Sequence, residues 1–319
     1  MKVVVTGGAG FIGANVVRTL LATGIADLVT VVDDLSTGSR ANLHGVDRCQ
    51  LIQGSILDPA TLDAALQRAA AVVHLAARPS VPRSLEDPLA SHRVNATGTV
   101  EVLEAVRRAG CPHAVLASSS SVYGAEATLP KHERLAPAPL SPYAASKLAS
   151  EAYALAYGHS FGVPVLAFRF FNVFGPFQPA GHAYAAVVPT FVDAALADRP
   201  LPVNGDGRQT RDFTFVGDVA DVIADAVRRR VTSPRPVNLA FGSRRDLLEV
   251  VAVLEDLLGR RLRIEHRPPR PGDVAHSQAD QGQLRTLFPD VSPVDFAAGL
   301  RATVEWMRSD AHVTEPTVA

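Results

Sequence analysis

The sequence predicts an α/β fold in which a doubly wound parallel sheet is followed by a smaller C-terminal α/β lobe. Two observations lead to this prediction. Short, nearly continuous apolar runs alternate with longer helical patterns through the first half of the chain, which is typical of a parallel sheet covered by helices on both faces. Glycines directly follow the first apolar run and open the first helix, which is typical of a phosphate-binding turn.

The apolar runs and helical patterns give the expected order of elements. Strands are expected at 2–7, 28–34, 49–54, 71–76, 113–118 and 163–170. Helices are expected from the first glycines to Gly24 and at 60–70, 84–109, 142–160, 184–197, 216–230 and 245–258. Proline and glycine become denser after about residue 170. We therefore expect one domain over 1–170 and a smaller lobe over 171–319, with some of the chain returning to the first domain.

Composition excludes several classes of function. The 319 residues are 47% hydrophobic and 20% charged, with a formal net charge of −1, so no broad basic field favours nucleic acid or an anionic membrane. There is no apolar stretch of membrane-spanning length, about 18 residues, and the N-terminus does not resemble a signal peptide. Cys49 and Cys111 form no CxxC pattern. We expect a cytoplasmic protein without disulfides or a metal site.

The glycines predict a dinucleotide site. Gly7, Gly10 and Gly13 form a GxxGxxG pattern between a strand and a helix, where bare backbone can approach a pyrophosphate at the helix N-terminus. Asp33 ends the second strand, twenty positions after Gly13, and its carboxylate can accept hydrogen bonds from a ribose. With Asp34 beside it, this position favours NAD over NADP. The alternative is a purely structural glycine-rich turn.

A tyrosine and a lysine form a candidate catalytic pair. Ser141 is a suitable N-cap and Pro142 a suitable first helical residue. Tyr143 then lies in the first turn, with Lys147 on the same face of the helix. A phenol has a pKa of about 10, which a neighbouring ammonium and the positive nicotinamide ring of bound NAD could lower toward neutrality. Tyr143 would then act as a general base; the alternative is a surface pair on an amphipathic helix.

Several motifs together resemble a known family. TGGAGFIG, VVDDLSTG, HLAA, SSSSVYG, YAASK, RFFNVFGP, GDGRQTRDFTFVGDVA and RPGDVAHSQAD occur in this order. They resemble the extended short-chain dehydrogenases/reductases, in particular the NAD-dependent nucleotide-sugar epimerases and dehydratases. The resemblance covers almost the whole chain and implies a Rossmann-type domain with tightly held NAD. It also implies a UDP-sugar in the cleft below the C-terminal lobe, and a homodimer formed through helices 84–109 and 142–160.

Carried over position by position, the resemblance implies a set of cofactor contacts. Ser55 stands where the family usually has Asp, which loosens the contact with the adenine. The implied cofactor residues are Gly7, Gly10, Phe11, Ile12, Gly13, Asp33, Asp34, Gly38, Ile56, Leu75, Ala76, Ala77, Asn95, Ser118, Tyr143, Lys147, Phe170 and Val173.

The resemblance also implies a set of contacts to the nucleotide sugar. Two arginines match phosphate-binding positions, where the guanidinium fork suits phosphate oxygens, and an aspartate matches the ribose-binding carboxylate. The implied substrate residues are Ser80, Ser119, Ser120, Asn172, Gln178, Ala186, Val187, Val203, Arg211, Arg270, Asp273 and Ser277.

The serine run at 118–124 bears on the reaction. The dehydratases that this chain resembles typically carry an acidic pair in the two positions before VYG, where this chain has Ser120 and Ser121. Ser119 matches the hydroxyl that relays the proton of the sugar 4-hydroxyl to Tyr143, so Ser119, Tyr143 and Lys147 are the expected catalytic residues. The resemblance favours a 4-epimerase that works through a transient 4-keto sugar. The alternative function is that of a dehydratase. The alternative interpretation of the serine run itself is a serine-rich loop at a strand end with no role in catalysis.

The sugar is less sharply defined. A bulky aromatic typically stands at the position of Ser277 in 4-epimerases restricted to plain hexoses, so the small side chain leaves room for an acetamido group that Ser80 and Gln178 could bind. UDP-glucuronate 4-epimerases tend to carry an arginine in the run that here reads PFQPAG. This run contains no arginine, which counts against UDP-glucuronate as the substrate. We expect exchange of UDP-GlcNAc with UDP-GalNAc, of UDP-glucose with UDP-galactose, or both. UDP-glucuronate 4-epimerisation stays an alternative.

Overall fold

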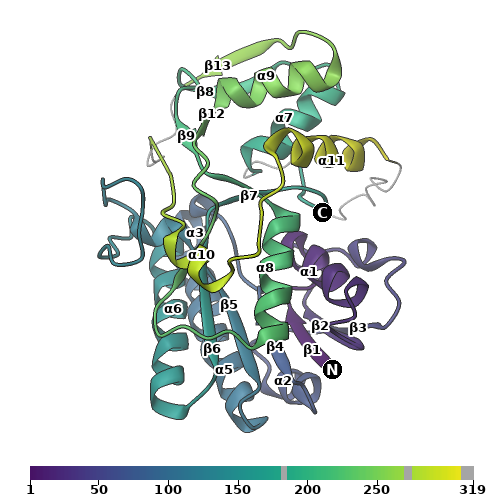
Figure 1. Cartoon of the computed structure of the whole chain (residues 1–319), viewed down its shortest axis with the longest axis vertical. Helices are drawn as coiled ribbons and strands as arrows, with labels where there is room; N and C mark the ends of the chain where they lie inside the picture. The colour runs from purple at the N-terminus through teal and green to yellow at the C-terminus, as the bar shows by residue number, and fades with distance from the viewer. Residues whose placement is uncertain (181–184, 269–274, 310–319) are drawn as a thin grey trace.

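A seven-stranded parallel sheet forms the centre of the molecule (Figure 1). The computed structural model describes residues 1–180, 185–268 and 275–309. The strand order is β11-β6-β5-β4-β1-β2-β3, so the order reverses between β1 and β4, and ligands bind beyond the carboxyl ends of the strands at such a switch point. The strands are β1 (Lys2–Thr6), β2 (Leu28–Asp33), β3 (Cys49–Gln53), β4 (Ala71–His74), β5 (His113–Ser119), β6 (Val165–Phe170) and β11 (Val237–Leu239).

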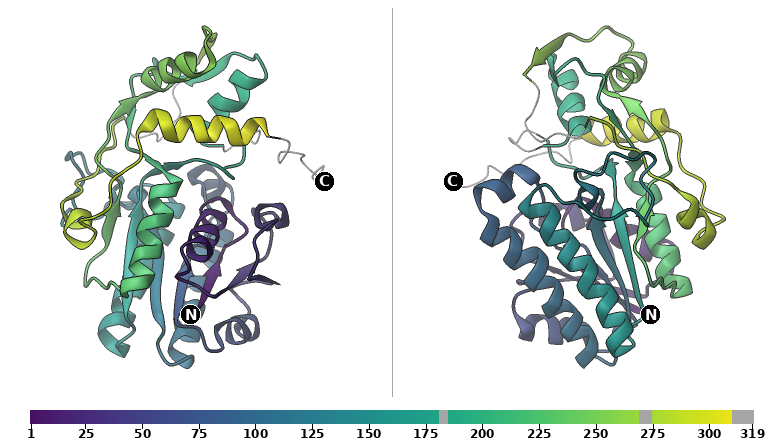
Figure 2. Two further views of the ribbon diagram at one scale, coloured as in Figure 1. Left: turned by 45° about the vertical axis from the view of Figure 1, so that its right-hand side comes forward. Right: turned by 90° about the vertical axis from the view of Figure 1, so that its left-hand side faces the viewer.

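Helices cover both faces of this sheet, as predicted. Alternate residues of β1 face opposite sides: Val3 and Val5 pack in one apolar core and Val4 in another. Helices α1 (Phe11–Ala22), α8 (Val216–Arg229) and α10 (Gly282–Leu287) contribute to the first core. Helices α2 (Pro59–Leu66), α5 (Gly98–Arg108) and α6 (Pro142–Phe161) contribute to the second. The two layers are visible in Figure 2.

The helix expected over 84–109 is broken into shorter pieces, so that expectation is wrong in its continuity. The chain instead forms α3 (Val81–Glu86), α4 (Pro88–His92), a π-helical turn η2 (Arg93–Thr97) and α5. Asp87 has non-helical backbone dihedrals, with φ −140° and ψ 84°, and caps α4 by accepting a hydrogen bond from the backbone N–H of Ala90 at 2.9 Å. Pro88 follows it, and a residue before proline is disfavoured in helical conformation.

The smaller lobe lies above the carboxyl end of the sheet in Figure 1. Its core includes Phe174, Phe213 and Phe296, whose rings lie 5.2–6.3 Å apart between centroids. Its helices are α7 (Val187–Leu196), α9 (Leu247–Leu258) and α11 (Phe296–Arg308). Its strand pairs are β8 (Leu201–Asn204) with β13 (Ile264–Arg267), β9 (Thr210–Arg211) with β12 (Arg245–Asp246), and β7 (Asn172–Phe174) with β10 (Phe213–Phe215).

Segments after residue 170 return to the sheet, as expected. Helix α8 packs on α1, and β11 pairs with β6 at the edge of the sheet. Neither β11 nor α11 was expected from the sequence pattern. The division of the chain near residue 170 remains a prediction about domain boundaries.

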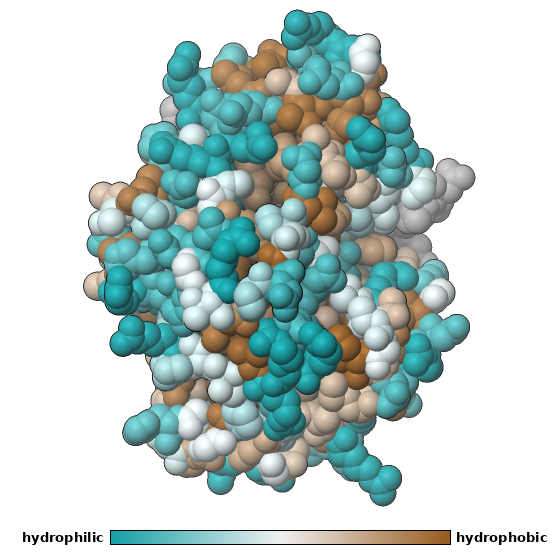
Figure 3. Space-filling model, in the orientation of Figure 1, coloured by the Kyte–Doolittle hydropathy of each residue, from teal (hydrophilic) through white to brown (hydrophobic). Residues whose placement is uncertain are grey.

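None of the described helices combines the length and the apolar character that crossing a membrane requires. The face drawn in Figure 3 mixes hydrophilic side chains with small apolar patches.

Two glycines determine how α1 meets β1. Gly7 has a φ of +71°, and a Cβ at this position would lie 2.6 Å from the backbone nitrogen of Ala76. A Cβ on Gly13 would lie 2.1 Å from the carbonyl oxygen of Gly7. Both distances are shorter than any van der Waals contact, so this turn can form only with bare backbone at both positions.

We expect Gly13→Ala to destabilise the protein by about 3 kcal/mol, the upper end for an overpacked site. Gly158→Ala is the control, because a Cβ there, in helix α6, meets its nearest atom at 3.4 Å. That change should stabilise the protein by up to about 1 kcal/mol. Urea unfolding of both variants measures the difference, and equal midpoints would contradict the steric argument.

Candidate active site

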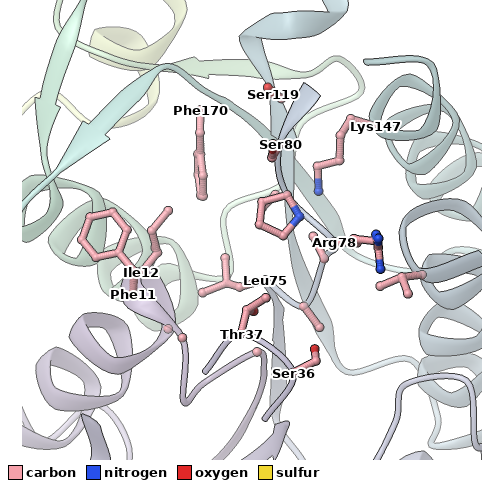
Figure 4. Close-up of a pocket in the computed structure, with 18 of the residues that line it drawn as sticks. Phe11, Ile12, Ser36, Thr37, Leu75, Arg78, Ser80, Ser119, Lys147 and Phe170 are labelled. Atoms are coloured by element: carbon pink, nitrogen blue, oxygen red, sulfur yellow. The ribbon is translucent and has the colours of Figure 1, made fainter. Parts of the chain in front are cut away.

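A cavity of about 710 Å³ lies at the carboxyl ends of the strands, where the strand order reverses (Figure 4). It brings together most of the residues that the sequence analysis assigned to cofactor and substrate. Those that line it are Gly7, Gly10, Phe11, Ile12, Gly13, Asp33, Asp34, Ile56, Leu75, Ala76, Ala77, Ser80, Ser118, Ser119, Tyr143, Lys147, Phe170, Asn172, Val173, Gln178 and Ala186.

The cofactor end of the cavity is built on the glycine turn and on Asp33. The Asp33 carboxylate accepts hydrogen bonds from the backbone N–H groups of Ala9 and Leu35, both at 2.9 Å. Burial raises the pKa of this carboxyl, while the two N–H donors act in the opposite direction. Each carboxylate oxygen can accept a further hydrogen bond. A bare-backbone turn at a helix N-terminus beside a fixed carboxylate fits the pyrophosphate and ribose of NAD.

The side chains expected to perform catalysis come from β5 and α6. Ser119 ends β5, and its Oγ accepts hydrogen bonds from the backbone N–H of Ser121 at 3.2 Å and from the Ser121 hydroxyl at 2.9 Å. Ser141 caps α6 as predicted, accepting a hydrogen bond from the Ala144 N–H at 3.1 Å. Tyr143 therefore lies in the first turn of α6, and Lys147 extends from the next turn toward the centre of the cavity (Figure 4).

Burial dominates the protonation of this pair. It raises the pKa of the Tyr143 phenol, while a hydrogen bond with Ser119 acts in the opposite direction. It lowers the pKa of the Lys147 ammonium, which is only 6% exposed, to about 8. We expected a tyrosine pKa near neutrality with NAD bound. The chain alone shifts it the other way, because removing a phenolate from water costs more than the nearby serine returns.

A second cavity of about 440 Å³ adjoins the first beneath the smaller lobe. Its lining includes Val187 and Arg211, both assigned to the substrate. The residues that line both cavities are Ser80, Asn172, Val173, Gln178 and Ala186.

The remaining predicted residues lie outside these two linings. Ser277 donates its backbone N–H to the carbonyl of Thr210 at 3.0 Å, next to Arg211 in the chain. Val203 is fully buried in the core of the smaller lobe. Gly38 lies against Ala9 of the glycine turn, and Ser120 lies in the short helix η3 (Ser120–Tyr123). Arg270 and Asp273 fall outside the described residues.

Comparison with known proteins identifies the family. The family model of the NAD dependent epimerase/dehydratase family matches residues 3–240. The chain belongs to this family. It is 37% identical to a UDP-glucose 4-epimerase of Mycolicibacterium smegmatis over 315 residues, which cover 97% of this chain and 99% of that relative.

Solved structures of this family share the fold. A UDP-N-acetylglucosamine 4-epimerase from Methanobrevibacter ruminantium M1, in complex with UDP-N-acetylmuramic acid, matches with a TM-score of 0.90 and 33% identity, covering 96% of this chain and 97% of that one. DesIV from Streptomyces venezuelae, a dTDP-glucose 4,6-dehydratase with NAD bound, matches with a TM-score of 0.90 and 34% identity, covering 99% of both chains. The predictions of family, fold and cofactor are confirmed.

In this member of the epimerase/dehydratase family, Asn95 supports the cavity wall from behind. It lies in the π-helical turn η2 and is 1% exposed. Its Oδ1 accepts the backbone N–H of Arg78 at 2.7 Å, and its Nδ2 donates to the Arg78 carbonyl at 3.2 Å and to the Ser146 hydroxyl at 2.9 Å. Asn95 thus joins the wall after β4 to the first turns of α6, rather than lining the cavity itself.

Two arginines that were not expected in the site from the sequence line the 710 Å³ cavity. Arg78 directly follows the HLAA motif, and Arg83 comes from the short helix α3. The sequence does contain a signal for them, because both arginines follow β4 closely. The loops at the carboxyl ends of parallel strands lie on the same side of a sheet, which is where ligands bind.

Acidic side chains are confined to one end of the cavity. Among the described residues, Asp33 and Asp34 are the only carboxylates in its lining, and both belong to the carboxyl end of β2 beside the glycine turn. The described part of the chain also contains no group of three or more His, Cys, Asp or Glu residues arranged to hold a metal ion. The described walls around Ser119 and Tyr143 therefore carry hydroxyls and cations rather than acids.

A buried ion pair lies beside strands β5 and β6. Glu151 and Arg169, which are 5% and 2% exposed, pair at 2.6 Å between Oε1 and a terminal guanidinium nitrogen. Arg169 Nε donates to Glu151 Oε2 at 2.9 Å, and the Ser118 hydroxyl donates to the same oxygen at 2.9 Å. Glu151 lies one turn beyond Lys147 on α6, so the pair ties this helix to β6 through Arg169 and to β5 through Ser118.

We expect Glu151→Gln to lower the free energy of unfolding by about 3–5 kcal/mol, because it leaves the Arg169 charge buried without a counter-ion. Asp63→Asn is the matched control. It breaks the exposed pair with Arg108 and should cost no more than about 1 kcal/mol. Urea unfolding measures both, and a double variant Glu151→Leu/Arg169→Met should lose less stability than Glu151→Gln alone. Equal losses in the two single variants would contradict this account.

Proposed function

We propose that this protein is a UDP-hexose 4-epimerase that uses tightly held NAD. It interconverts UDP-GlcNAc and UDP-GalNAc, UDP-glucose and UDP-galactose, or both. The main support for this proposal is the set of residues that line one cavity. The glycine turn, Ser119, Tyr143 and Lys147 all line it, and its only described carboxylates lie at the cofactor end. UDP-sugar 4-epimerases among the similar proteins support the same activity.

Ser119, Tyr143 and Lys147 divide the proton chemistry between them. When bound, NAD would supply the acceptor and donor of hydride for C4 of the sugar, and its oxidised ring would supply a positive charge. Tyr143 accepts the proton of the 4-hydroxyl, with the Ser119 hydroxyl as the relay. Lys147, with a pKa of about 8, stays mostly protonated at neutral pH and stabilises the tyrosinate. Because burial raises the pKa of Tyr143, its deprotonation depends on the positive charge present in the loaded enzyme.

The serine run supports epimerisation over dehydration. Elimination of water from the sugar needs a group that donates a proton to the leaving hydroxyl. Near Ser119 the chain offers the hydroxyls of Ser120 and Ser121, and a serine hydroxyl is not an acid of that strength near neutral pH. The similarity to a dTDP-glucose 4,6-dehydratase makes dehydration the second candidate, which product analysis separates from the first.

The junction of the two cavities supports the use of an N-acetylated sugar. Ser80 and Gln178 both line this junction. The Gln178 amide donates from Nε2 to the Val173 carbonyl at 3.2 Å, while its buried Oε1 has no hydrogen-bond partner among the described residues. An acceptor in that position suits the N–H of an acetamido group. Arg83, near Ser80 in the same lining, is a reason to include UDP-glucuronate among the sugars tested.

We expect Tyr143→Phe to lower turnover of UDP-sugars by about 10²–10⁴-fold, because the variant lacks the proton acceptor. Its NAD content should stay that of the wild type. Tyr153→Phe, on the exposed face of the same helix, is the control and should be fully active. The assay incubates each protein with UDP-GlcNAc, UDP-glucose and UDP-glucuronate and follows mass and stereochemistry at C4.

An isobaric C4 epimer supports the proposal. Loss of water from the sugar would replace it with dehydration. Full activity of Tyr143→Phe would refute the assigned base, and wild-type protein that holds NAD yet converts no nucleotide sugar would refute the enzymatic proposal as a whole.

The proposal includes a homodimer in the cytoplasm. Helices α3, α4, α5 and α6 pack together on one face of the sheet, and they carry exposed apolar side chains, including Leu85 at 63% and Leu89 at 72% exposure. Exposed apolar side chains gathered on one face favour an interface with another protein surface. These are the helices expected to pair from the resemblance described above.

We expect Leu89→Glu to dissociate the dimer, because a carboxylate would be buried without a partner. Sedimentation velocity measures the change in mass. Leu140→Glu is the control, since Leu140 is 64% exposed but lies in the loop before α6 rather than on these helices. Wild-type protein that sediments as a monomer would refute the homodimer.

A further inference from the structure

A tight turn brings Gln178 to the junction of the two cavities. The backbone N–H of Gln178 donates to the carbonyl of Gly175 at 3.3 Å, which closes a four-residue turn. Pro176 takes the second position and Phe177 the third, with a φ of +68°. A positive φ at the third position is typical of a type II turn, where glycine or asparagine is preferred. A phenylalanine there costs free energy that contacts of its side chain must offset.

The Phe177 ring lies between the two halves of the molecule. The guanidinium carbon of Arg18 is 4.9 Å from the ring centroid, and the Trp306 ring lies 5.4 Å away between centroids, tilted by 56°. Arg18 belongs to α1 beside the sheet and Trp306 to α11 of the smaller lobe, which lies above α1 in Figure 1. The Asn15 amide on α1 also donates to the Pro176 carbonyl at 3.0 Å.

Arg18 also connects the Phe177 ring to the cofactor end of the cavity. Arg18 donates to the carbonyls of Asn42 at 2.9 Å and His44 at 3.1 Å. The Asn42 amide donates in turn to the carbonyl of Ala9 in the glycine turn at 2.8 Å. The guanidinium that holds Phe177 is therefore itself held by the segment packed on the glycine turn.

We propose that Phe177 is a positioning residue. Its ring, held between Arg18 and Trp306, fixes the position of the turn that presents Gln178 to the sugar at the junction of the cavities. The inference rests on the proposed function only in naming UDP-GlcNAc as the ligand. Loss of the ring lets the turn move, so ligand binding weakens while Ser119, Tyr143 and Lys147 keep their places.

The test compares Phe177→Gly with Phe177→Tyr. Glycine adopts the positive φ without strain but removes the ring, whereas tyrosine keeps the ring. Calorimetric titration of NAD-loaded protein with UDP-GlcNAc should show Kd raised about tenfold in Phe177→Gly, the size of one lost hydrogen bond. Phe177→Tyr should bind like the wild type, and kcat of both variants should stay within about twofold of it, because this interaction acts on binding rather than on the chemical step.

Trp306 supplies a readout that does not depend on activity. It is the single tryptophan of the sequence, so removing the Phe177 ring should shift its emission to longer wavelength in the absence of ligand. Phe177→Tyr should leave the emission unchanged.

The outcomes separate this inference from the proposed function. An unchanged Kd in Phe177→Gly, with or without an emission shift, overturns the positioning role. Weaker binding by Phe177→Gly with no turnover in the wild type overturns the epimerase and keeps the positioning role. A wild type that binds no UDP-GlcNAc overturns the positioning role and the use of an N-acetylated sugar, whereas the epimerase proposal then depends on the assay with UDP-glucose.

Discussion

The contact between the first turn of α1 and the end of β1 is the constraint on which the site depends. The helix can begin there only because Gly13 and Gly7 bring bare backbone together. This placement puts the Ala9 N–H within 2.9 Å of Asp33, so the end of β2 is held against the turn. It also points the N-terminus of α1 into the cavity, where its free N–H groups and positive dipole end can attract a pyrophosphate.

Much of the fold could be predicted because strands buried on both faces must be apolar throughout. The six strands expected from apolar runs all form, with ends that differ by one or two residues. The seventh, β11, has only three residues, and its place in the sheet comes from pairing with β6 rather than from a local pattern. The break before Pro88 had a local signal in the sequence. The π-helical turn over Arg93–Thr97 had none, and its Asn95 carbonyl accepts a hydrogen bond at 2.7 Å from the hydroxyl of Ser150, which is distant in sequence.

For the candidate site, the sequence identified many residues by their type and spacing, but it did not indicate the direction or the surroundings of their side chains. Glycines, Asp33, Tyr143 and Lys147 could be found from motifs, and all line one cavity. The sequence does not reveal that Asn95 acts on the backbone of Arg78, that Val203 points into a core, or that burial raises the pKa of Tyr143. These properties depend on the direction of a side chain and on what surrounds it, which only the packed structure determines.

The return of the chain to the sheet limits how the two halves can move. After β6 the backbone passes into the smaller lobe, comes back for α8 and β11, enters the lobe again for α9, returns for α10 and enters the lobe once more for α11. Domains joined by one linker can swing about it as a hinge. Here several connections would have to bend together, and rotation about any one of them is restrained by the others. Opening and closing over a ligand is therefore confined to small sliding or rocking displacements, and neither half can be excised as a continuous segment.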